Sequence, residues 1–133
     1  MPLFHHVRNT VNELLAPSGI AIVRKEKLPW KWLNRTVTTR VGQYFIEIPG
    51  VSPMTSHYTR NPNWSSQLGR MTSIIRKKYP AMAAIDVGAN VGDTACIIKS
   101  GEDIPLLCIE GDEFAFGFLQ KNIAQFKNTT AHQ

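Results

Sequence analysis

The stretch AAIDVGANVGDTACII, residues 83–98, constrains the fold of this chain more than any other feature. It joins a short apolar run to a turn with two glycines, and Val91, Ala95 and Ile98 then recur at helical spacing. A second apolar run, PLLCIE, and a second helical pattern over residues 112–126 follow. This order predicts a βαβα unit with parallel strands near residues 84–88 and 105–109.

Strands that are apolar along their whole length are typical of a parallel sheet with helices on both faces. We therefore expect the fold class to be α/β, Rossmann-like and doubly wound, over residues 81–133. The preceding region, residues 1–80, should be α+β. Its patterns predict a helix at 7–15, a hairpin or two strands over 37–48, an irregular polar loop at 51–67 and a helix at about 65–78.

The composition is that of a soluble globular protein, with 43% hydrophobic and 19% charged residues among 133. Neither a signal-peptide pattern nor a run of about 20 apolar residues is present, so cytoplasmic localisation and no membrane contact are the default expectations. Cys96 and Cys108 lack the close spacing of zinc ligands or a redox pair. We interpret them as reduced structural thiols and expect no metal.

The glycines of DVGANVG follow the first strand of the unit, where doubly wound folds bind their ligands. Gly88 and Gly92 carry no side chain, so the backbone can approach a ligand closely there. Asn90, between them, is one of the few other residues that enter the left-handed region readily. The turn therefore predicts a ligand site beside the N-terminus of the next helix. A turn that serves only tight packing is the plainer alternative.

Two carboxylates refine this prediction. Glu110 ends the second strand, 24 positions after Asp86, where an acidic side chain can accept hydrogen bonds from a ribose diol. Asp86 at the end of the first strand is poorly placed for a pyrophosphate and well placed for the cationic amino-acid portion of a sulfonium cofactor. The pair favours S-adenosylmethionine over NAD.

The segments AIDVGANVGDTA and CIEGDEFAFGFLQKNI resemble the first half of FkbM-family methyltransferases, which are class I S-adenosylmethionine-dependent enzymes. The resemblance covers about residues 81–128. It implies methyl transfer to oxygen, often a hydroxyl of a sugar or secondary metabolite, so a small-molecule or glycan acceptor is expected. It also implies the cofactor-binding residues, which are Asp86, Gly88, Ala89, Asn90, Gly92 and Glu110. The family usually has proline after the acid, whereas Gly111 stands there in this chain.

The resemblance also implies a larger sheet than this chain provides. We expect only two core strands, because the third should begin where the sequence reads NTTAHQ. The chain is therefore expected to be a truncated fragment that is inactive by itself. No catalytic residue is assigned.

Other interpretations stay open. His57 and Tyr58 could orient a substrate hydroxyl, although a histidine in a loop is more often simply exposed. The basic runs at 23–27 and 74–80 could bind nucleic acid. No recognition motif accompanies them, so a solvated helix face is the better interpretation. Trp64 could stack on a substrate ring, but burial is the commoner role. Two further function classes remain. An NAD-dependent oxidoreductase would need the full G-x-G-x-x-G motif, which this chain lacks, and a non-catalytic binding module is the other alternative.

Overall fold

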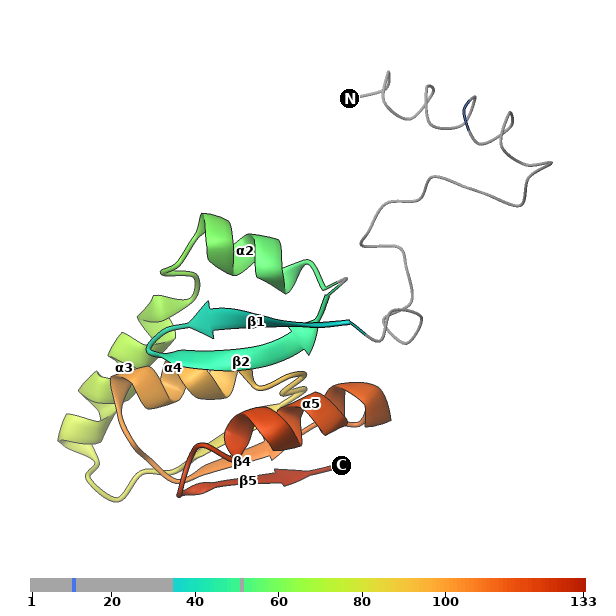
Figure 1. The fold of residues 1–133 in the computed structure, drawn as a ribbon. Coiled ribbons are helices and arrows are strands. Elements are labelled where there is room, and N and C mark those ends of the chain that lie inside the picture. Colours follow the sequence, from blue (N-terminus) through green and yellow to red (C-terminus); the bar gives the residue numbers. More distant parts are fainter. Residues whose placement is uncertain (1–10, 12–34, 51) are drawn as a thin grey trace.

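The structure is a computed structural model that describes residues 11, 35–50 and 52–133. The expected helix at 7–15 and the basic run at 23–27 lie outside the described residues, apart from residue 11. Figure 1 shows the elements in chain order: β1 (Thr36–Val41), β2 (Tyr44–Pro49), α2 (Met54–Arg60), α3 (Ser66–Lys78), β3 (Ala84–Val87), α4 (Asp93–Gly101), β4 (Leu106–Ile109), α5 (Glu113–Ile123) and β5 (Thr129–His132).

Three parallel strands form the sheet that the sequence places in the second half of the chain. Strand β4 lies in the centre, with β3 on one side and β5 on the other. Both pairings are parallel, with Ala84 opposite Leu106 and Leu106 opposite Thr129. The predicted parallel strands are confirmed. The expectation of only two core strands is wrong, because residues 129–132 pair with β4 as a third.

Helices α4 and α5 lie on the same side of this sheet (Figure 1). Strands that are added in one direction, through crossovers of one hand, place their helices on one face. On the other face, Ile85 and Val87 remain 67% and 76% exposed. The prediction of a sheet covered on both faces is therefore wrong for the described part of the chain.

The antiparallel hairpin β1–β2 forms a third layer over the two helices (Figure 1). Val41, Ile46 and Ile48 of the hairpin are almost completely buried, and they belong to the same hydrophobic cluster as residues of α4, β4 and α5. Sequence and structure agree on the hairpin. The predicted parts 1–80 and 81–133 thus share one core within the described residues.

The side chain of Asn122, on α5, joins the hairpin to the helix layer. Its Oδ1 accepts from the backbone N–H of Glu47 at 2.8 Å, and its Nδ2 donates to the carbonyl of Glu47 at 2.8 Å. Nδ2 also donates to the carbonyl of Val91 at 2.8 Å. Asn122 is only 4% exposed, so these bonds satisfy an amide that water does not reach.

Helix α2 occupies part of the segment for which the sequence predicts an irregular loop, so that prediction is wrong for residues 54–60. The cause is contact with distant parts of the chain. Tyr58 is only 5% exposed, and it packs into the core while donating a hydrogen bond from its hydroxyl to Asp93 Oδ2 at 2.7 Å. Burial of one face stabilises a short helix that its polar composition does not favour. Helix α3 matches the helix expected at 65–78.

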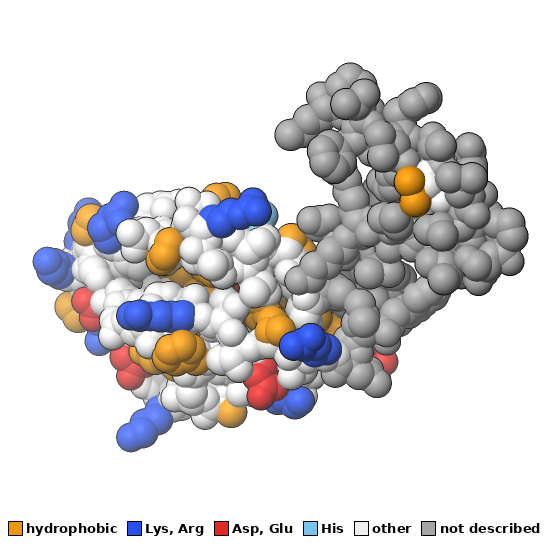
Figure 2. Space-filling view, turned by 45° about the horizontal axis from the view of Figure 1, so that its top comes forward, with side chains coloured by type: hydrophobic (Ala, Val, Ile, Leu, Met, Phe, Trp, Pro, Cys, Tyr) orange, Lys and Arg blue, Asp and Glu red, His pale blue; other side chains and the backbone are white. Residues whose placement is uncertain are grey.

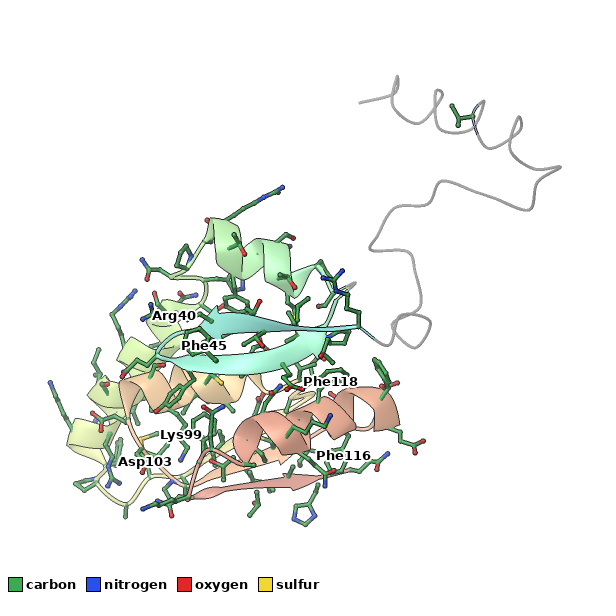
Figure 3. The ribbon with its side chains drawn as sticks, viewed as in Figure 1. Arg40, Phe45, Lys99, Asp103, Phe116 and Phe118 are labelled. Atoms are coloured by element: carbon green, nitrogen blue, oxygen red, sulfur yellow. The ribbon has the colours of Figure 1, made fainter. Side chains whose placement is uncertain are left out.

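A buried lysine lies in the last turn of α4. Lys99 Nζ donates to Asp103 Oδ1 at 2.6 Å and to the carbonyl of Ile104 at 2.7 Å. The ammonium also lies 5.8 Å from the centre of the Phe126 ring. Figure 3 shows Lys99 and Asp103 at the same end of the helix layer. The aliphatic part of the side chain is buried while the charge keeps hydrogen-bond partners.

The two cysteines lie in the core as free thiols, each 0% exposed. Burial, with the nearby charge of Asp93, raises the pKa of Cys96 to about 12. Burial and the charge of Asp86 raise the pKa of Cys108 to about 11. Both groups are therefore protonated at neutral pH and behave as small apolar side chains.

We predict that Asn122→Leu lowers the free energy of unfolding by at least about 2 kcal/mol, because the backbone groups of Glu47 and Val91 lose their partner. Urea denaturation measures this change. Gln120→Ala, at an exposed position of the same helix, is the control and should stay within about 0.5 kcal/mol of the parent. Equal stability of Asn122→Leu and the parent would contradict the role given to this side chain.

Candidate functional site

The turn between β3 and α4 has an unusual backbone conformation. Gly88, Asn90 and Gly92 all have positive φ angles, of 78°, 49° and 88°. The backbone N–H groups of Gly88 and Ala89 both donate to the carbonyl of Ile109, at 2.8 and 3.0 Å. The turn is thus tied to the end of β4, at the carboxyl edge of the sheet where doubly wound folds bind ligands.

The two glycines of the turn have different surroundings. A Cβ added to Gly88 would meet no atom within 4 Å, so this glycine faces open space. A Cβ at Gly92 would lie 3.1 Å from Leu119 Cδ1 and 3.4 Å from Ile123 Cγ2. Gly92 therefore allows α5 to pack closely on the turn, while Gly88 leaves room beside it. The predicted ligand-facing role suits Gly88 better than Gly92.

Glu110 holds the turn directly. Its Oε2 accepts from the backbone N–H of Asn90 at 2.7 Å, and its Oε1 accepts from the N–H of Asp112 at 2.8 Å. The backbone N–H of Glu110 also donates to the carbonyl of His132, at the end of β5, at 3.0 Å. Each carboxylate oxygen can accept more than one hydrogen bond, so capacity for a diol is left. The sequence pattern did not reveal that Glu110 shapes the turn.

Asp86 and Asn90 contribute buried oxygens that lack partners. Asp86 Oδ2 and Asn90 Oδ1 have no hydrogen-bond partner among the described residues. Burial raises the pKa of the Asp86 carboxyl, and the charges of Asp93 and Glu110 raise it further. Among the described residues no cationic group pairs with Asp86, and a cationic ligand would stabilise its charged form.

Asp93 is a site residue that the sequence reasoning did not single out. It is the first residue of α4, directly after Gly92, and it accepts the hydrogen bond from Tyr58. The signal available in the sequence was an acid in the first helical turn after a glycine turn. Burial, together with Asp93, raises the pKa of Tyr58, so this phenol stays protonated and is unsuited to act as a base. His57 instead lies edge-on against Trp64, with 5.4 Å between the ring centres.

A cavity of about 860 Å³ lies away from the turn, between the hairpin and helices α2, α3 and α4. None of the six predicted cofactor residues lines it, whereas Tyr58 does. The carboxylates and this cavity are therefore in different places.

Within the described residues, no helix is long and apolar enough to cross a membrane. Nor do three or more His, Cys, Asp or Glu side chains come together there as metal ligands would. Figure 2 shows lysine and arginine side chains spread over the visible face, with acidic side chains among them.

Comparison with known proteins adds little to this geometry. No protein-family model matches the chain, and no curated protein matches it. Among solved structures, a protein-L-isoaspartate O-methyltransferase is similar, with a TM-score of 0.36 and 11% identity over 94% of this chain. This chain covers 41% of that structure's chain. So distant a likeness carries no argument, and the FkbM resemblance stays a prediction from the motifs.

The different surroundings of the two glycines give a prediction. Gly88→Ala should lower the free energy of unfolding by about 1 to 2 kcal/mol, the cost of a left-handed backbone for a residue with a Cβ. Gly92→Ala should cost more, because the same strain is joined by close contacts to Leu119 and Ile123. Chemical denaturation of both variants compares them, with Gly117→Ala, at a helical position with open space, as control. If Gly88→Ala proved the more damaging, the assignment of the two glycines would be reversed.

Proposed function

We propose that the turn and its carboxylates form the S-adenosylmethionine site of a methyltransferase. The single observation that carries the proposal is Asp86, a partly buried carboxylate at the carboxyl edge of a parallel sheet, with one oxygen unpaired among the described residues. It stands next to a glycine turn that leaves open space at Gly88. An unsatisfied buried acid at such an edge favours a ligand that brings a positive charge.

The residues fit the parts of this cofactor. Asp86 would face the cationic methionine end, and Glu110 would accept from the ribose hydroxyls with the lone pairs that Asn90 and Asp112 leave free. The backbone at Gly88 and Ala89 would lie alongside the ligand, with Asn90 and Gly92 holding the turn in its left-handed conformation. When bound, the cofactor supplies an electrophilic methyl group on sulfur.

The charge of the site distinguishes S-adenosylmethionine from NAD. Asp86, Asp93 and Glu110 lie near enough for the charges of the last two to raise the pKa of the first. A pyrophosphate at this turn would meet three carboxylates, and the repulsion would oppose its binding. A sulfonium and an ammonium group would be attracted. The acidic cluster therefore supports the methyltransferase over the oxidoreductase.

The acceptor that we propose is a hydroxyl of a sugar or another small metabolite, which gives O-methylation. The support for this step is the resemblance of residues 81–128 to the FkbM family. Transfer of a methyl group from a sulfonium chiefly needs the acceptor oxygen to be close and aligned, so a dedicated base is not essential. We assign none, and Tyr58 is held by Asp93.

Asp86→Asn tests the cofactor role because it should change affinity and stability in opposite directions. Asn keeps the shape but loses the charge, so affinity for S-adenosylmethionine should fall roughly tenfold or more. The protein without ligand should become more stable at neutral pH, because its fold disfavours a charged Asp86. Calorimetric titration measures the affinity and urea denaturation the stability.

The pH dependence of this variant's stability follows from the raised pKa of Asp86 in the parent. The stability advantage of Asp86→Asn should be largest above the folded-state pKa of Asp86 and should disappear below the ordinary pKa of 3.8, where the carboxyl is protonated in both states. Glu47→Gln makes the same charge change on an exposed side chain and should alter neither quantity. The proposal fails if Asp86→Asn binds S-adenosylmethionine as the parent does, or if the parent binds NAD instead.

A further inference from the structure

The cavity between β1, α2, α3 and α4 is a second site, and we propose that it binds a sugar phosphate. Its volume of about 860 Å³ lies within the range of roughly 300 to 1,000 Å³ that is usual for small-molecule sites. Its walls come from elements far apart in the sequence, from Thr38 to Gly101. The inference does not rest on the proposed methyl transfer, because ligand binding here can be measured without any cofactor.

The charge of the walls favours an anion. Arg40 and Arg70 line the cavity, and no aspartate or glutamate does so among the described residues. Arg40 Nε donates to the carbonyl of Gly42 at 3.1 Å, and an Arg70 terminal nitrogen donates to Ser66 Oγ at 3.1 Å. Neither guanidinium forms an ion pair with another described residue. Figure 3 shows Arg40 on β1, at the end of the hairpin that lies toward α3.

These hydrogen bonds leave the arginines available. A guanidinium carries five N–H donors in a planar fork, and each side chain here uses one of them in the bonds described. The remaining donors match the oxygens of a phosphate, which arginine binds in a bidentate way. Two such groups line the cavity, one from β1 and one from α3, and together they are suited to a doubly charged phosphate monoester.

The rest of the wall suits a hydroxylated ring. Trp64 is 49% exposed and lines the cavity, so the predicted burial of this residue is wrong, and the exposed part of its ring can contact a sugar while His57 packs edge-on against it. Thr55 also lines the cavity, and its Oγ1 is buried with no hydrogen-bond partner among the described residues. A further hydroxyl and an amide line the cavity, at Thr59 and Asn63. Such groups both donate and accept, as the hydroxyls of a sugar do.

The cavity and the glycine turn have opposite electrostatic character, and a hydrogen bond of Tyr58 links them. Tyr58 lines the cavity, and its hydroxyl donates to Asp93 at the start of α4. A phosphate is repelled by the carboxylates around the turn and attracted by the arginines of the cavity. The anionic end of the ligand would therefore bind on the arginine side.

The test is calorimetric titration of the full chain with glucose 6-phosphate, glucose and inorganic phosphate at fixed ionic strength. We expect saturable binding of glucose 6-phosphate and at least tenfold weaker binding of glucose and of phosphate alone. Arg70→Gln and Arg40→Gln should each weaken glucose 6-phosphate binding roughly tenfold and leave glucose unchanged, since each removes a charge-assisted bond. Trp64→Ala should weaken both sugars by the same factor.

Lys77→Gln is the matched control, because it removes a positive charge from an exposed position of α3 that does not line the cavity. It should bind glucose 6-phosphate like the parent. Circular dichroism checks that each variant keeps its fold. The proposal is overturned if glucose 6-phosphate does not saturate the chain, if phosphate alone binds as tightly, or if Lys77→Gln loses as much affinity as Arg70→Gln.

Discussion

The side chain of Asn122 is the contact on which the arrangement of the layers depends. It pairs with both backbone groups of Glu47 as a neighbouring strand would, and it binds the carbonyl of Val91 inside the glycine turn. One buried amide thus fixes the hairpin, α5 and the turn relative to one another. From the other side, Ile109 and Glu110 hold the same turn by accepting its N–H groups. The left-handed conformation is therefore held by the end of β4, by Glu110 directly after it and by α5, which keep an otherwise costly backbone in place.

The three carboxylates near the turn differ in how the fold satisfies them. Glu110 accepts two backbone N–H groups, and Asp93 accepts the hydroxyl of Tyr58. Asp86 keeps an oxygen without a partner, and burial and its acidic neighbours disfavour its charge. Two of the acids thus have hydrogen-bond partners within the fold, and the third carries a free-energy cost that the described residues do not offset. A cationic ligand is the kind of group that would lower this cost, which is the reason for the cofactor proposal.

Local patterns were sufficient to predict β3, α4, β4 and α5, because each carries its own periodicity and the turn between the first two has its own residues. They were insufficient where position depends on distant parts of the chain. Helix α2 forms because Tyr58 is buried against the core, which its polar neighbours do not reveal. Ile85 and Val87 fit a buried strand, yet they lie on the bare face, since strand order decides which face the helices cover. The separate roles of Gly88 and Gly92 likewise depend on where α5 packs.

The net charge of +5 does not predict a ligand, because the fold places acidic and basic side chains in different regions. The charges of Asp93 and Glu110 act on Asp86 near the turn. Arg40 and Arg70 line the cavity. Tyr58 links the two regions, and its pKa is raised by burial and by Asp93, so it stays neutral. A neutral phenol adds no charge to either region, and its hydroxyl gives Asp93 a hydrogen-bond partner. The carboxylates near the turn and the arginines of the cavity are thus two separate groups of charge, and one neutral side chain joins them.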